Sequence, residues 1–156
     1  MTPAVFLDSS AIVKLSMDEL GSEWLRSEVR DRLELLFAVR VAGVEVVSAI
    51  ARRRKSAQLS VETASRLIDQ VWIEFEDQFN VMEVNPFLAT FAMNIADIHG
   101  LRAYDAIQLA AAVEANDQRL FFGLSPLTFV SADRELNEAA LREGLLVEDP
   151  NQHPSP

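Results

Sequence analysis

The chain has 156 residues, of which 49% are hydrophobic and 24% charged, a balance typical of a folded globular protein. It contains no cysteine, which excludes disulfides and thiolate metal sites, and its net charge of −10 argues against nucleic-acid binding by overall charge attraction. No apolar run approaches the roughly 20 residues that span a bilayer, and the N-terminus lacks a secretory pattern. We therefore expect a soluble, cytoplasmic protein with one domain.

The first half of the chain alternates short apolar runs with segments of helical spacing. The elements expected there are a strand at 4–7, a helix N-capped by Ser9 or Ser10, a helix at 21–35, a strand at 35–39, a helix from Val44 and a long amphipathic helix at 60–79. The first strand (AVFL) ends abruptly at Asp8.

The second half continues the same alternation. The elements expected there are a strand at 80–84, a helix ending at His99 and Gly100, a helix at 103–116, a strand at 127–133, a helix at 134–144 and a strand at 145–149. The polar segment at 149–156 is expected to be a disordered tail. Short strands that alternate with helices predict an α/β fold, whose parallel sheet is covered on both faces.

Four acidic residues stand in unusually apolar surroundings: Asp8, Glu45, Asp105 and Asp133. Asp8 and Asp133 each end a predicted strand, and ligands of parallel sheets bind at the carboxyl ends of strands. Clustered carboxylates repel one another, and a divalent cation relieves that repulsion. Oxygen ligands without Cys or His favour Mg²⁺ or Mn²⁺.

Each acid also has an ordinary structural interpretation, which the sequence leaves open. Asp8 and Asp133 suit the N-caps of the helices that follow them. Glu45 and Asp105 suit the first turn of a helix, where a carboxylate stabilises the helix dipole. Three other kinds of site are excluded. The chain has no Gly-rich loop for a nucleotide phosphate, no GxSxG motif of a serine hydrolase, and too few histidines, two, for a His-rich zinc site.

Taken together, VFLDSSAIVKL, the isolated Glu45, LRAYDAIQLAAA and FVSADREL resemble the PIN-domain ribonucleases, in particular the VapC-type toxins of toxin–antitoxin pairs. The resemblance extends over about residues 4–147. It implies a three-layer α/β/α PIN-like fold over residues 1–148, with a short, mainly parallel sheet of about five strands.

The resemblance also implies roles for individual residues. Asp8 would be the central metal ligand, Glu45 and Asp105 further ligands, and Asp133 an outer ligand or a water-orienting acid. Ser10 and Ser131 would support the site. Gln108 stands where many relatives carry His, at a position that is at most a neighbour of the ligands.

The activity implied is that of an Mg²⁺- or Mn²⁺-dependent endoribonuclease and toxin, with RNA as substrate, a cognate antitoxin as partner, and a homodimer as the usual assembly. A basic cluster, Arg52, Arg53, Arg54 and Lys55, follows Glu45 on the same predicted helix and could meet RNA phosphates. A solvated helix end is the alternative for this cluster.

Three other functions compete with the nuclease. A PIN fold without catalysis would serve as an interaction protein, and it should bind Mn²⁺ poorly. A dehalogenase-like phosphatase needs a second Asp where this chain has Ser10. A phospho-acceptor receiver domain needs paired acids after the first strand and a Lys at the end of a late strand, and the late segment FVSAD has neither this Lys nor an equivalent.

Overall fold

The computed structural model describes residues 3–32 and 35–154. Its centre is a five-stranded sheet in the order β3-β2-β1-β4-β5, in which every neighbouring pair is parallel. The strands are β1 (Val5–Leu7), β2 (Leu36–Val39), β3 (Asn80–Met82), β4 (Thr128–Val130) and β5 (Leu146–Glu148). The α/β fold with a short parallel sheet is therefore confirmed.

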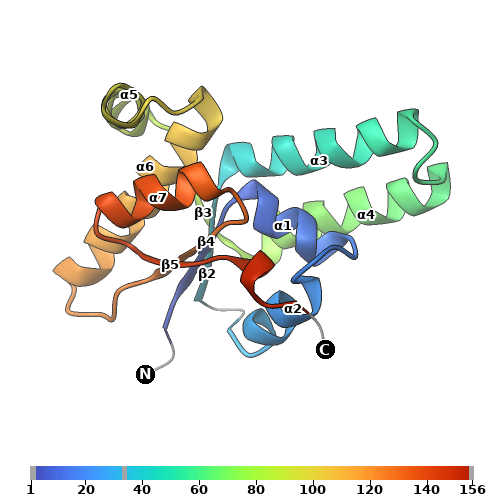
Figure 1. The fold of residues 1–156 in the computed structure, drawn as a ribbon, viewed down its shortest axis with the longest axis horizontal. Helices are drawn as coiled ribbons and strands as arrows, with labels where there is room; N and C mark the ends of the chain where they lie inside the picture. Colours follow the sequence, from blue (N-terminus) through green and yellow to red (C-terminus); the bar gives the residue numbers. More distant parts are fainter. Residues whose placement is uncertain (1–2, 33–34, 155–156) are drawn as a thin grey trace.

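Helices cover both faces of this sheet. They are α1 (Ser9–Ser16), α2 (Ser22–Arg30), α3 (Arg40–Lys55), α4 (Val61–Ile73), α5 (Pro86–His99), α6 (Ala103–Phe121) and α7 (Arg134–Arg142), with a π-helix η2 (Glu74–Gln78) and a 3₁₀ helix η3 (Pro150–Gln152). Figure 1 shows α1, α3 and α4 on one side of the strands and α5 and α6 on the other. Three layers result, because right-handed crossovers that run in opposite directions place their helices on opposite faces.

The strand order creates a switch point between β1 and β4. The chain moves outward from β1 to β3, then returns through α5 and α6 to place β4 against the free edge of β1. The register pairs Leu7 with Val130, so the carboxyl ends of these two strands lie level. Asp8 and Ser131, the next residues in each chain segment, therefore emerge side by side at the place where α/β folds bind ligands.

The core is built from strand residues and from small residues of α6. Phe6 and Phe129 are fully buried, and their rings stack across β1 and β4 at 5.9 Å. Ala110 and Ala111 are also fully buried, since their short side chains let α6 lie close against the sheet. Because β1 and β4 are packed on both faces, their sequences are continuous apolar runs.

Several element boundaries differ from the sequence predictions. The N-cap of the first helix is Asp8 rather than Ser9 or Ser10, since Asp8 accepts a hydrogen bond from the Ala11 N–H at 2.9 Å. Helix α3 begins at Arg40, not at Val44. Its N-cap is Val39, which has no capping side chain, so the sequence carries no start signal there. The helix expected from 103 runs to Phe121, five residues beyond the prediction.

The long helix expected at 60–79 changes to a π-helix at Glu74. Glu74 is buried, and its Oε2 has no hydrogen-bond partner among the described residues. Burial raises the pKa of Glu74 to about 7, and a hydrogen bond from Gln70 opposes that rise. A carboxyl group in this place favours its protonated form up to neutral pH, because ionisation would leave an uncompensated charge in the interior.

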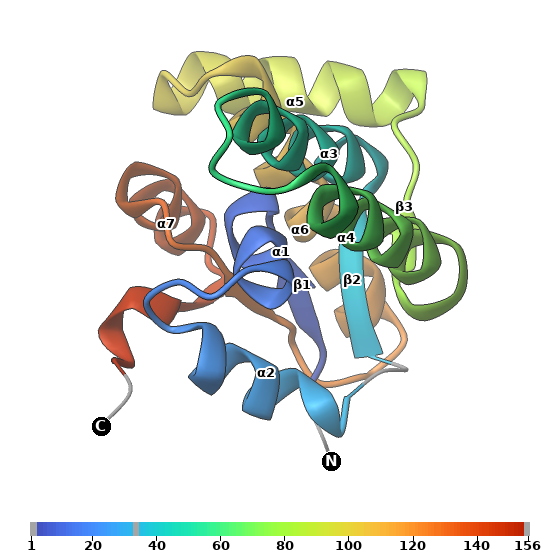
Figure 2. The ribbon, with the colours of Figure 1, turned by 90° about the vertical axis from the view of Figure 1, so that its right-hand side faces the viewer.

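The C-terminal segment, expected to be disordered from 149, packs against α2 in its described part (Figure 2). Gly21 adopts φ +82° and touches η3 so closely that a Cβ would lie 2.1 Å from the Pro150 carbonyl oxygen. The His153 ring stacks on Trp24 at 3.9 Å between centroids. Within residues 3–32 and 35–154, no helix combines the length and apolarity needed to cross a membrane.

Candidate functional site

Asp8 lies at the end of β1 with only 2% of its surface exposed. Its Oδ1 accepts hydrogen bonds from the Ala11 N–H at 2.9 Å and from Ser10 Oγ at 2.6 Å. Burial raises the pKa of Asp8 to about 6, and the nearby charge of Asp133 adds to the rise, while hydrogen bonds from Ser10, Ser131 and Ala11 oppose it. The capping interpretation of Asp8 is therefore confirmed, yet the cap is buried where its charge is costly.

Two serines join the segments that follow β1 and β4. Ser10 donates to Asp8 and also accepts a hydrogen bond from the Ala132 N–H at 2.9 Å, across the switch point. Ser131 Oγ accepts from the Asp133 N–H at 3.0 Å. Asp133 itself caps α7. These bonds hold Asp8 and Asp133 in a fixed relation, close enough for their charges to interact.

Glu45 and Asp105 approach from the first residues of two long helices. Asp105 is in the first turn of α6, as expected, whereas Glu45 is in the second turn of α3 because that helix starts earlier than predicted. Burial raises the pKa of Asp105, and the charges of Asp133 and Glu45 raise it further, while Arg102 lowers it. Asp105 thus couples electrostatically to two of the other three acids.

Gln108, which the resemblance places at most beside the ligands, contacts one of the candidate acids. It is 1% exposed, and its Nε2 donates to Glu45 Oε1 at 2.8 Å, although the two residues are 63 positions apart. Its Oε1 is buried without a partner among the described residues. Gln108 lies three residues after Asp105 and therefore shares a face of α6 with it, but its partner Glu45 could not be foreseen from the sequence.

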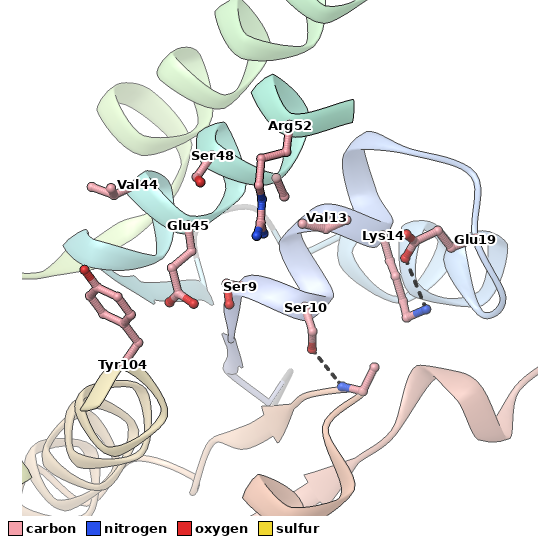
Figure 3. Close-up of a pocket in the computed structure, with 12 residues that line it drawn as sticks. Ser9, Ser10, Val13, Lys14, Glu19, Val44, Glu45, Ser48, Arg52 and Tyr104 are labelled. Atoms are coloured by element: carbon pink, nitrogen blue, oxygen red, sulfur yellow. Dashed lines mark hydrogen bonds and ion pairs between the residues drawn. The ribbon is translucent and has the colours of Figure 1, made fainter. Parts of the chain in front are cut away.

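A cavity of about 600 Å³ opens beside Glu45 (Figure 3). Its lining comes from α1, α3, the start of α6 and the segment after β4, and includes Ser10, Lys14, Glu45, Ser48, Arg52, Tyr104 and Ala132. Lys14 is buried and donates to the Leu20 carbonyl oxygen at 2.8 Å. The lining therefore carries two carboxylates, Glu45 and Glu19, and two cations, Lys14 and Arg52, and Glu45 is its only member of the four candidate acids.

The structure divides the basic cluster at the end of α3. Arg52 points into the cavity, as Figure 3 shows. Arg53 turns away and pairs with Glu19 at 2.7 Å. Arg54 and Lys55 are exposed at the last turn of the helix. Only part of the predicted basic surface thus faces the acidic site.

The donor chemistry of this site fits a hard divalent cation. The four candidate acids offer only carboxylate oxygens. Burial and the repulsion of neighbouring carboxylates raise the pKa values of Asp8 and Asp105, and a bound cation would offset both effects. In the part of the chain that the structure describes, no three His, Cys, Asp or Glu side chains lie close enough to enclose a metal ion. As the described side chains stand, a bound ion would therefore need water or substrate oxygens as well as these carboxylates.

The sequence matches the family model of the PIN domain over residues 5–141. It is 33% identical over 120 residues to Ribonuclease VapC45 of Mycobacterium tuberculosis (strain CDC 1551 / Oshkosh), a match that covers 76% of this chain and 81% of that protein. The chain belongs to the PIN domain family, as its motifs predict.

Two solved structures share the fold at low sequence identity. FitAcB from Neisseria gonorrhoeae superposes with a TM-score of 0.67 at 18% identity, over 96% of this chain and 99% of that chain. VapBC2 from Rickettsia felis, solved with a DNA fragment from its promoter, superposes with a TM-score of 0.61 at 10% identity, over 94% of this chain and 98% of that chain. These likenesses confirm the PIN fold.

Proposed function

We propose that the protein is an endoribonuclease that depends on Mg²⁺ or Mn²⁺ and hydrolyses RNA phosphodiester bonds. The observation that carries the proposal is the electrostatic coupling of four acids near the switch point between β1 and β4, which come from four different chain segments. The relative named Ribonuclease VapC45 supports the substrate class.

Asp8, Glu45 and Asp105 are the candidate ligands in this proposal, of which one or two would contact the ion directly in the arrangement described here, and Asp133 would orient water or act as an outer ligand. A bound cation would lower the pKa of a water molecule and would stabilise the negative charge on the leaving oxygen. Mg²⁺ is commonly held by one or two carboxylates together with substrate phosphate oxygens, which suits a site without an enclosed ligand cluster.

Other residues hold these acids in position. Gln108 fixes the Glu45 carboxylate through its amide, and Ser10 ties the Asp8 carboxylate to the backbone after β4. Arg52, with Arg54 and Lys55 farther along α3, attracts the RNA backbone toward an otherwise acidic protein. Arg53 is left out of this set because Glu19 already neutralises it.

The same proposal includes a toxin role, with a cognate antitoxin as partner and a homodimer as the assembly. The structure of VapBC2 supports a partner protein, and the name VapC of the relative supports the toxin class. An antitoxin that covers the site would face both the carboxylates and Arg52. Its contact residues would therefore include positively and negatively charged side chains.

The test is cleavage of a panel of defined tRNA and rRNA fragments by the purified protein in Mg²⁺, in Mn²⁺ and in EDTA. We expect discrete cuts with either metal and none in EDTA. Thermal unfolding in the same buffers reports metal binding independently, since a ligand of the native state raises the unfolding temperature. Absence of cleavage in every fragment would contradict the nuclease, and if the metals also leave the unfolding temperature unchanged, the result favours an interaction protein.

Gln108→Leu should lower the cleavage rate about tenfold or more, because it removes the hydrogen bond that orients Glu45 and keeps a buried side chain of similar size. The measurement is kcat and KM under metal-saturated conditions. Gln118→Leu is the matched control, since Gln118 is exposed on the same helix and bonds only to Glu114. Equal rates for both variants would remove Gln108 from the site.

A further inference from the structure

Asn137 is a buried polar residue that the proposed mechanism does not use. It lies near the start of α7, four residues after the cap Asp133, and is 7% exposed. Its Nδ2 donates a hydrogen bond to the Ser131 carbonyl oxygen at 2.7 Å. Its backbone N–H bonds to the Asp133 carbonyl oxygen at 2.9 Å, as in any helix, so the side chain adds a second bond to the segment between β4 and α7.

The oxygen of the same amide lacks such a partner. Asn137 Oδ1 is buried and makes no hydrogen bond to any described residue. A buried oxygen without a partner typically costs at least as much stability as one neutral hydrogen bond contributes. The amide therefore gives this position no net stability over an apolar side chain of similar size, and what distinguishes it is the group that its Nδ2 holds in place.

That group is the peptide between Ser131 and Ala132. The Ser131 carbonyl and the Ala132 N–H belong to one peptide unit, and because the peptide bond is planar, the direction of one fixes the direction of the other. The Ala132 N–H donates to Ser10 Oγ at 2.9 Å, the bond drawn from Ser10 in Figure 3. Asn137 thus sets the orientation of a peptide whose opposite side reaches across the switch point to α1.

Ser10 connects this peptide to the buried acid of the site. Its hydroxyl donates to Asp8 Oδ1 at 2.6 Å. Three hydrogen bonds of 2.7, 2.9 and 2.6 Å therefore form a continuous path from the Asn137 amide to the Asp8 carboxylate. A rotation of the Ser131–Ala132 peptide would break the bond to Ser10 and remove one of the contacts that orient Asp8.

We propose that Asn137 is a positioning residue of the acidic site: it fixes the Ser131–Ala132 peptide, so that Ser10 holds the Asp8 carboxylate in its ligand orientation. The inference rests on the proposed function and adds to it a residue that acts on Asp8 only through other groups. The same segment continues to Asp133, whose N–H donates to Ser131 Oγ at 3.0 Å, so a displaced peptide would also shift a second acid.

Hydrogen exchange in the metal-free protein tests the structural step. The Ala132 amide, observed by ¹⁵N NMR, should exchange faster in Asn137→Leu, which keeps a buried side chain of similar size and removes the donor. Asn137→Ala, which favours the helix and removes the same donor, is the second variant. Asn116→Leu is the matched control: Asn116 is 8% exposed, and its Oδ1 accepts from the Leu127 N–H at 3.0 Å, at the opposite end of β4. Unchanged exchange of Ala132 in both Asn137 variants would overturn the inference.

Metal binding and cleavage test the functional step. We expect Asn137→Leu to weaken Mn²⁺ binding in isothermal titration calorimetry and to lower kcat, each about tenfold, as the loss of a residue that orients a metal ligand does. Asn116→Leu should lose stability in urea unfolding but keep the wild-type Mn²⁺ affinity and kcat. Ser10→Ala combined with Asn137→Leu should lose no more activity than Ser10→Ala alone, because both changes interrupt one path. Additive losses, or the same loss of kcat in Asn116→Leu, would contradict the positioning role.

The same measurements separate this inference from the nuclease itself. RNA cleavage at equal rates by the wild type and Asn137→Leu removes the positioning role and keeps the nuclease. Faster Ala132 exchange and weaker Mn²⁺ binding in Asn137→Leu, without cleavage by either protein, keep the positioning role and remove the nuclease. A wild type that neither binds Mn²⁺ nor cleaves RNA overturns both.

Discussion

Asp8→Asn should reduce metal-dependent RNA cleavage by at least about 100-fold, because it removes the carboxylate charge at the centre of the proposed site. Loss of a residue that merely orients a metal ligand already costs about 10–100-fold in many metalloproteins, and a ligand should cost more. The measurement is cleavage of the fragment best cut by the wild type, in Mn²⁺ and in Mg²⁺. The stabilising effect of Mn²⁺ on thermal unfolding should also shrink in the variant.

The same substitution should make the metal-free protein more stable at alkaline pH. Asn keeps the side-chain oxygen that caps α1 and accepts from Ser10, and it carries no charge. The pKa of Asp8 is raised from 3.8 to about 6 in the fold, so the folded state binds the proton more tightly than the unfolded state does. Wild-type stability therefore falls as pH rises from about 4 through 6, by roughly 3 kcal/mol from this group alone.

Urea unfolding in EDTA at pH 4 and pH 8 checks this prediction. We expect equal free energies of unfolding at pH 4 and a more stable Asp8→Asn variant at pH 8. Glu74, whose pKa is also raised by burial, leaves part of the pH dependence in both proteins. Asp117→Asn, on the exposed face of α6, should match the wild type in cleavage and in stability at both pH values. A loss of stability in Asp8→Asn at pH 8 would contradict the cost assigned to the buried charge.

Gly21→Ala should destabilise the protein by about 2–4 kcal/mol. Its backbone is in the left-handed region, which costs a non-glycine residue about 1–2 kcal/mol. In addition, the new Cβ would lie 2.1 Å from the Pro150 carbonyl oxygen, which is backbone and cannot rotate away. Relief requires η3 to move from α2 and weakens the stacking of His153 on Trp24.

Gly123→Ala separates these two costs. Gly123 also has a positive φ, +69°, but a Cβ there would meet nothing within 4 Å. Its loss of stability in urea unfolding therefore measures the backbone cost alone, and Gly21→Ala should exceed it by at least 1–2 kcal/mol. Equal losses of unfolding free energy in the two variants would mean that the close contact between Gly21 and Pro150 adds no cost to Gly21→Ala.

The amino-acid sequence by itself determined the strands, the helix signals and the positions of the acids. Three of the five strands, β1, β2 and β4, are short and mostly buried apolar runs, each followed by a polar residue, whereas the two edge strands β3 and β5 are more exposed. Gly100 ends α5 in the left-handed conformation as its position predicts. Asp8 and Asp133 could be placed at one edge of the sheet because parallel strands share the direction of their carboxyl ends.

Only the tertiary structure decided which side chains meet. The bond between Gln108 and Glu45 joins α6 to α3 across 63 residues, and it depends on the switch point that brings the two helices together. The basic cluster divides because successive residues of a helix point about 100° apart, so Arg52 enters the cavity while Arg53 meets Glu19. Local propensity carries no information about such partners, since sheet order and helix rotation set them.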